Sequence, residues 1–151
     1  MNNDIYQQDV KTLAQNACGH CYFSEEKKNN SVSLDNPLCG DRITMRITLS
    51  DGKIETVNHH VKGCLLCQAA ASVIGESAPG CDPSEINHII KNFSLMLKEK
   101  NVLDLTNNKW ASIKSLQPVA HHKSRHACVL LPFKALTEVL NLHNNLKQIE
   151  L

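Results

Sequence analysis

Three short segments of the chain each carry a cysteine next to residues that shape the backbone. They are Asn36–Arg42, Gly63-Cys64 and Arg125–Cys128. In the first, Pro37 fixes its own φ and Gly40 can adopt a positive φ, so Cys39 and Asp41 lie in a tight turn. Three thiols and one carboxylate are enough to close a tetrahedral metal site. The sequence therefore predicts a metal site formed by Cys39, Asp41, Cys64 and Cys128.

The expected positions of these ligands indicate what the site does. Cys64 and Cys128 each lie where a helix is predicted to begin, and the unpaired N–H groups and dipole of a helix start favour thiolate over thiol. Thiolate is both a metal ligand and a nucleophile. Asp41 is a harder and weaker ligand for a soft metal than a fourth thiolate would be. Such a site can open, which favours delivery or turnover over a permanent structural role.

Four further cysteines leave alternatives open. Cys18 and Cys21 form a CxxC pair that is interpreted as solvated loop thiols, a redox pair or half of a second metal site. Cys67 forms another CxxC with Cys64, and helical spacing places the two thiols on a shared face. Cys67 is interpreted as an auxiliary ligand, a sulfur acceptor or a packed core thiol. Cys81 is expected to be structural.

The first half of the chain predicts one helix and a small sheet. A helix runs from an Asp4 cap to Gly19, and residues 24–31 form a polar surface loop. A short strand at 32–34 and an alternating strand at 43–49 follow. Asp51-Gly52 predicts a tight hairpin turn. The return strand, 54–61, loses its alternation near Thr56-Val57, which predicts a β-bulge there.

The second half is predicted to be helical. A helix rich in small residues follows Cys64 and ends at Pro79-Gly80, and Asp82-Pro83-Ser84-Glu85 is a strong helix start. A short helix is expected at 109–116, ended before Pro118. The last helix is expected to begin near Cys128, with Pro132 in its first turn. This order predicts an α+β fold with helices packed on one face of the sheet, in a single domain spanning 1–151.

Composition excludes several classes of function. The chain has 151 residues, 42% of them hydrophobic, and a formal net charge of +1 with scattered basic residues, which argues against nucleic acid or an anionic membrane as partner. No apolar run is long enough to span a membrane and the N-terminus does not read as a signal peptide, so a cytoplasmic protein is expected. Seven cysteines then favour metal or redox chemistry over disulfides. The histidines at 59, 60, 121, 122 and 126 are interpreted as surface residues, with His126 the one closest to a motif.

The first cysteine segment resembles a known family. Asn36–Ile43 resembles the NPxCGD motif of the U-type iron–sulfur assembly proteins, which comprise IscU, SufU and the N-terminal domain of NifU. Gly63-Cys64, with its Ala/Ser-rich helix, and Arg125–Cys128 look like the second and third cysteine motifs. The resemblance covers roughly residues 4–146. The long interval from Cys64 to Cys128, and Ala127 in place of a histidine, make it closer to the SufU branch.

The resemblance implies a fold and a function. It implies a small three-stranded antiparallel sheet with helices packed on it and a metal site at one end. The four predicted ligands would hold a [2Fe-2S] cluster or Zn2+. A pyridoxal-phosphate cysteine desulfurase would donate persulfide sulfur, with Cys128 as the favoured acceptor, and apo iron–sulfur proteins would be the clients.

Three functions follow from these observations. The leading hypothesis is a scaffold or sulfur acceptor in iron–sulfur cluster assembly, and a zinc-dependent sulfurtransferase that does not itself carry the cluster is the alternative. A structural zinc module built on the two CxxC pairs is the third. The chain also departs from the family: Gln15–Cys21 replaces a His and an Asn-Pro-Arg-Asn run, and Cys67 replaces a non-thiol residue.

Overall fold

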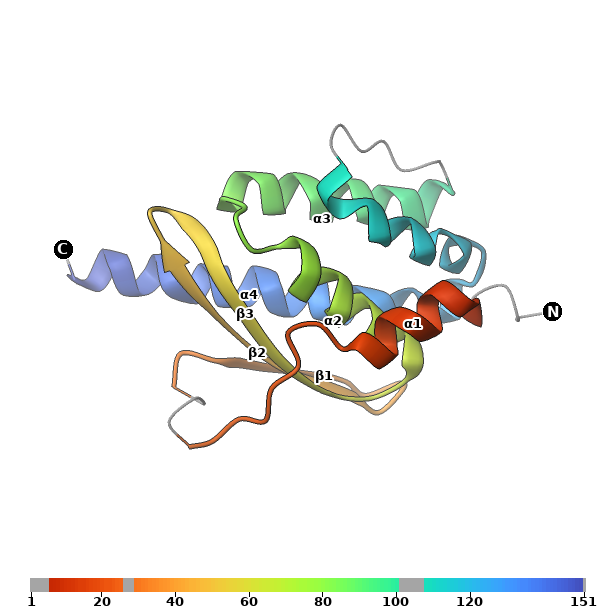
Figure 1. Cartoon of the computed structure of the whole chain (residues 1–151), viewed down its shortest axis with the longest axis horizontal. Helices are drawn as coiled ribbons and strands as arrows, with labels where there is room; N and C mark the ends of the chain where they lie inside the picture. The colour runs from red at the N-terminus through yellow and green to blue at the C-terminus, as the bar shows by residue number, and fades with distance from the viewer. Residues whose placement is uncertain (1–5, 26–28, 101–107, 151) are drawn as a thin grey trace.

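The computed structural model describes residues 6–25, 29–100 and 108–150 (Figure 1). Its elements in chain order are α1 (Gln8–Asn16), β1 (Val32–Asn36), β2 (Asp41–Ser50), β3 (Lys53–Lys62), α2 (Leu65–Ser77), α3 (Pro83–Glu99), η2 (Asn108–His121), η3 (Lys123–Arg125) and α4 (His126–Glu150). Within these ranges, no helix combines the length and apolar character needed to cross a membrane.

The three strands form one antiparallel sheet in the order β1-β2-β3, as predicted. The alternating apolar residues of β2 are buried on one face, namely Ile43, Met45 and Ile47. Asp51 and Gly52 both have positive φ, which is the conformation of the predicted hairpin turn. The bulge is present but falls slightly earlier than predicted. Thr48 pairs with Thr56 and Leu49 with Ile54, so Glu55 is the extra residue.

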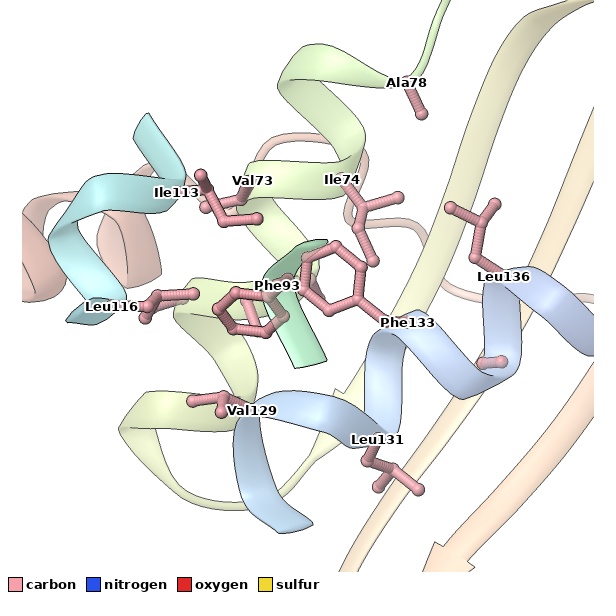
Figure 2. Packing of buried hydrophobic residues seen from close by; sticks show 14 of the residues in the cluster. Val73, Ile74, Ala78, Phe93, Ile113, Leu116, Val129, Leu131, Phe133 and Leu136 are labelled. Atoms are coloured by element: carbon pink, nitrogen blue, oxygen red, sulfur yellow. The ribbon is translucent and has the colours of Figure 1, made fainter. Parts of the chain in front are cut away.

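Helices cover one face of this sheet in two layers (Figure 1). α4 lies against β1 and β2, and α2 lies against β3 and α4. α3 and η2 form the outer layer on α2 and α4. Figure 2 shows the core between the helical layers, where the rings of Phe93 and Phe133 lie 4.8 Å apart between centroids. The predicted α+β fold is confirmed.

Two helix starts follow directly from local sequence. Cys64 is the N-cap of α2, and Asp82 is the N-cap of α3, where its side chain accepts a hydrogen bond from the Glu85 N–H at 2.8 Å. The first helix ends earlier than predicted, because Ala17 adopts the left-handed conformation two residues before Gly19. The predicted cap at Asp4 lies outside the described residues.

Two predictions in the C-terminal half were wrong. The segment expected to stop before Pro118 is a 3₁₀ helix that passes through it. Four of its buried residues, Trp110, Ile113, Leu116 and Val119, recur every three positions, which is the 3₁₀ period and not the α period, and Ala120 is buried beside Val119. The last helix begins at His126, so Pro132 lies in its second turn and removes the N–H that would bond to the Cys128 carbonyl.

Candidate metal and sulfur site

The turn between β1 and β2 presents Cys39 to solvent. The Asn36 carbonyl accepts a hydrogen bond from the Gly40 N–H at 2.8 Å, and the Asn36 side-chain oxygen accepts one from the Leu38 N–H at 3.3 Å. Gly40 has a φ of +72°, as its place in a tight turn requires. Leu38 is 91% exposed and Cys39 is also exposed. Cys39 is therefore the site thiol that a partner protein can reach.

Asp41 connects the start of β2 to the start of α2. Its carboxylate is buried, and Oδ1 accepts a hydrogen bond from the Cys64 N–H at 2.9 Å. Oδ2 lies 3.8 Å from the Cys64 Sγ. A Cβ on residue 63 would lie 2.5 Å from Asp41 Oδ1, which explains why a glycine precedes Cys64. The carboxylate thus sits at a helix N-terminus, where negative charge is favoured.

Cys128 completes the cluster from the first turn of α4. Its Sγ lies 3.4 Å from the Cys39 Sγ, although the two residues are 89 positions apart in the chain. The ligand atoms of Cys39, Asp41 and Cys128 all lie within 4.8 Å of one another. Cys64 borders this group through its contact with Asp41. The structure brings all four predicted residues together, and their role as metal ligands stays a prediction.

Burial changes the expected protonation of Cys128. Desolvation raises the pKa of the Cys128 thiol, and a hydrogen bond with Cys39 and the charge of Cys64 raise it further. Burial therefore opposes the expected preference of a helix start for thiolate at this residue. Sulfur-rich donors packed this closely fit a soft cation, since a metal deprotonates a coordinating thiol.

Residues around the third cysteine differ in their relation to the site. The pKa of Arg125 is raised by the charge of Tyr6 and then by a hydrogen bond with Cys128, so Arg125 does lie beside the site thiol. His126 instead contacts the end of η2, where its Nε2 lies 3.1 Å from the Ala120 carbonyl oxygen.

The Cys18–Cys21 segment is tied down on α2 and β3. The Cys18 N–H donates to the Ser72 Oγ at 3.0 Å, and His59 Nε2 lies 2.7 Å from the Cys18 carbonyl oxygen. Two backbone hydrogen bonds connect Gly19 and Cys21 to His59. His59 is 2% exposed, so its interpretation as a surface residue was wrong. Its place two residues after the buried Val57 was the available signal.

The remaining cysteines are buried. Cys67 and Cys81 are fully buried, and the Cys81 Sγ lies 3.5 Å from the Ser77 carbonyl oxygen, in agreement with the expected structural role of Cys81. Burial raises the pKa of the Cys67 thiol, as do the charges of Asp41, Cys64 and Cys39. All seven cysteines lie in the described ranges and are thiols.

A helix-covered antiparallel sheet with three thiols and a carboxylate at one end defines a class of small α+β proteins with a candidate metal site. Comparison identifies the family. A model of the NifU-like N terminal domain matches residues 5–115, and the chain belongs to this family. The match includes the first two cysteine motifs, whereas Cys128 lies beyond it. The predicted membership of the U-type assembly family is confirmed.

Two relatives have contrasting names. The chain is 31% identical over 105 residues to the zinc-dependent sulfurtransferase SufU of Bacillus subtilis (strain 168), with 70% of each chain covered. It is 28% identical over 116 residues to the iron–sulfur cluster assembly scaffold protein IscU of Thermotoga maritima, covering 77% of this chain and 75% of that one.

Two crystal structures share the fold. The N-terminal part of a nitrogen-fixing NifU-like protein from Brucella abortus matches with a TM-score of 0.84 and 27% identity, covering 95% of this chain and 96% of that one. A putative scaffold protein for the SUF system from Fervidobacterium islandicum AW-1 matches with a TM-score of 0.76 and 25% identity, covering 88% and 94%.

Proposed function

We propose that this protein serves iron–sulfur cluster assembly, as a scaffold that accepts sulfur and carries the growing cluster at Cys39, Asp41, Cys64 and Cys128. The observation that carries the proposal is the convergence of three thiols and a carboxylate from three separate segments. Family membership and the relatives named SufU and IscU support the same role.

Sulfur would arrive as a persulfide on a cysteine desulfurase, the proposed cytoplasmic partner. An acceptor thiolate attacks the terminal sulfur, the S–S bond breaks, and the desulfurase cysteine leaves as a thiolate. Cys128 is the proposed acceptor, and because burial raises the pKa of its thiol, a metal bound at the site would supply the deprotonation. Because Cys128 is buried and its Sγ lies 3.4 Å from that of the exposed Cys39, sulfur can pass between these two thiols.

The iron–sulfur cluster is the cargo, to be passed to apo iron–sulfur proteins. Asp41 is the weakest of the four donors for a soft metal and is therefore the proposed release point. The alternative function, a zinc-dependent sulfurtransferase, uses the same residues. Zinc bound there would keep its cysteine ligands deprotonated. Among the described residues, Cys18 and Cys21 belong to no close group of three candidate ligands, which disfavours the structural zinc module.

The deciding experiment measures iron, zinc and acid-labile sulfide in anaerobically purified protein, together with its visible spectrum. We expect iron and sulfide after reconstitution, with a charge-transfer spectrum, and most of this content to be lost in Cys39→Ser, Cys64→Ser and Cys128→Ser. Cys81→Ser is the matched control, because Cys81 is buried outside the site.

Two results would contradict the scaffold function. One zinc with no sulfide, both before and after reconstitution, would favour the sulfurtransferase. Equal metal content in the three site variants and in Cys81→Ser would mean that the metal is bound elsewhere.

A further inference from the structure

Cys64 and Cys67 form a CxxC pair at the N-terminus of α2, and the function proposed above does not use Cys67. We propose that Cys67 is a resolving thiol: it forms a disulfide with Cys64 and releases sulfur carried by Cys64 as sulfide. This inference rests on the proposed function for the arrival of sulfur at the site. The pairing of the two thiols can be tested without it.

Backbone geometry places the two side chains together. Cys64 is the N-cap of α2 and has extended backbone angles, while Cys67 is the third helical residue. Side chains at these two positions reach each other's backbone N–H groups in a capping box, so they lie at the same corner of a helix. A disulfide joins Cβ atoms about 3.5–4.5 Å apart, and the CxxC spacing across the first turn of α2 lets rotation of the two side chains reach this range.

The surroundings assign different roles to the two thiols. Cys64 is half-buried and lies 3.8 Å from Asp41, inside the candidate site. Both Cys64 and Cys128, the proposed acceptor, lie in this cluster with Asp41 and Cys39, so we place the transfer of sulfur from Cys128 to Cys64 within it. Cys67 is fully buried, and no incoming protein can reach it directly. Cys64 is therefore the thiol that receives sulfur, and Cys67 is the buried thiol that attacks the Cys64 Sγ.

The step balances without a further oxidant. With a persulfide on Cys64, the Cys67 sulfur attacks the Cys64 Sγ and the bond from Sγ to the terminal sulfur breaks. The terminal sulfur leaves with the bonding pair and takes the Cys67 proton, giving hydrogen sulfide. The two cysteine sulfurs supply the two electrons that reduce it and end as a disulfide. A dithiol reductant from outside then restores both thiols.

This step would supply what cluster assembly consumes. Clusters contain sulfide, whereas a persulfide carries its terminal sulfur at a more oxidised level. A resolving thiol next to the acceptors produces sulfide beside the cluster ligands and not in solution. Asp41, with its hydrogen bond to the Cys64 N–H, holds the start of α2 in place for the attack.

The first test asks whether the pair forms. The full chain, treated with chelator, is equilibrated in glutathione redox buffers, quenched with acid and alkylated. Cleavage after Lys62 and Glu76 gives the fragment 63–76, which contains Cys64 and Cys67 but not Cys81. We expect an internal disulfide in this fragment in the wild type and in Cys81→Ser. Its absence from the wild type under oxidising buffers would overturn the proposal.

The second test follows sulfide release after loading with glutathione persulfide. We expect the wild type and Cys81→Ser to release sulfide as the disulfide forms. Cys67→Ala and Cys67→Ser should retain sulfane sulfur on Cys64 and lose this release, and circular dichroism checks that both variants fold. Release at the wild-type rate from either folded variant would overturn the proposal. A wild type that takes up no sulfane sulfur would instead contradict the proposed sulfur acceptance, and the first test then decides the pairing.

Discussion

At the scale of single residues, Asp41 performs two tasks with one carboxylate. Oδ1 accepts the Cys64 N–H, and Oδ2 faces the Cys64 thiol within the candidate metal site. The sequence left a choice between a turn carboxylate that binds backbone N–H groups and a metal ligand. The geometry allows both, because the two oxygens contact different groups of Cys64, its backbone N–H and its thiol.

Substitutions at Asp41 should separate these tasks. Asp41→Ala leaves the Cys64 N–H without its acceptor and should lower the free energy of unfolding by about 1–3 kcal/mol. Asp41→Asn keeps an oxygen acceptor and should cost less. Both substitutions remove the carboxylate that is the proposed release point, so both variants should retain a reconstituted cluster longer. Urea titration and the rate of cluster transfer to an apo iron–sulfur protein measure the two effects, and an unchanged transfer rate in both variants would exclude Asp41 as the release point.

At the scale of elements, His59 holds three parts of the fold together. It lies on β3, its ring bonds to the Cys18 carbonyl after α1, and its backbone pairs with Gly19 and Cys21. Cys18 is in turn held by Ser72 of α2. Burial, opposed by the hydrogen bond to the Cys18 carbonyl and assisted by the charges of His20 and His60, lowers the pKa of His59 to about 4.

This burial predicts a pH dependence of stability. Between about pH 6.5 and about pH 4 the unfolded chain binds a proton at His59 and the folded chain does not. The contribution of neutral His59 to the free energy of unfolding is therefore complete above about pH 6.5. It is lost as the pH falls toward about 4, by at most about 3 kcal/mol. Denaturant titrations across this range should show a steeper loss for the wild type than for His59→Gln. His88→Gln, on the exposed face of α3, is the control and should keep the wild-type slope.

At the scale of the whole molecule, the outer helical layer is joined to the inner one by aromatic packing. Phe93 of α3 and Phe133 of α4 are fully buried against each other (Figure 2). Phe133 belongs to the same helix as Cys128, so the outer layer supports the helix that carries a site thiol. The single tryptophan, Trp110, is buried in η2 and reports on the outer layer.

Removing one ring tests whether the layers unfold together. Phe93→Ala should lower the free energy of unfolding by about 3–5 kcal/mol, because it leaves a cavity in a packed core. Trp110 fluorescence and far-ultraviolet circular dichroism should give coincident transitions. Leu95→Ala, at a residue of α3 that is 41% exposed, should have little effect. Separate transitions for the two probes would show that the outer layer unfolds independently.

The sequence by itself determined the features that depend on neighbouring residues. The Asn36–Asp41 turn, the alternation of β2, the Asp51-Gly52 hairpin and the Asp82 cap all formed as predicted, because each depends on local φ preferences and side-chain contacts. The motif around Cys39 also identified the family. The 3₁₀ period of η2 was also predictable, since the apolar residues Trp110, Ile113, Leu116 and Val119 recur every three positions.

Only the tertiary structure decided which side chains are buried and which residues remote in the chain lie close together. It placed the Sγ atoms of Cys39 and Cys128 3.4 Å apart across 89 positions, left Cys39 exposed, and buried Cys128 and Cys67. Burial depends on which remote elements pack over a residue, and local sequence contains no record of that. Burial also raises the pKa of the Cys128 thiol, which opposes the preference for thiolate that its place near a helix start predicted.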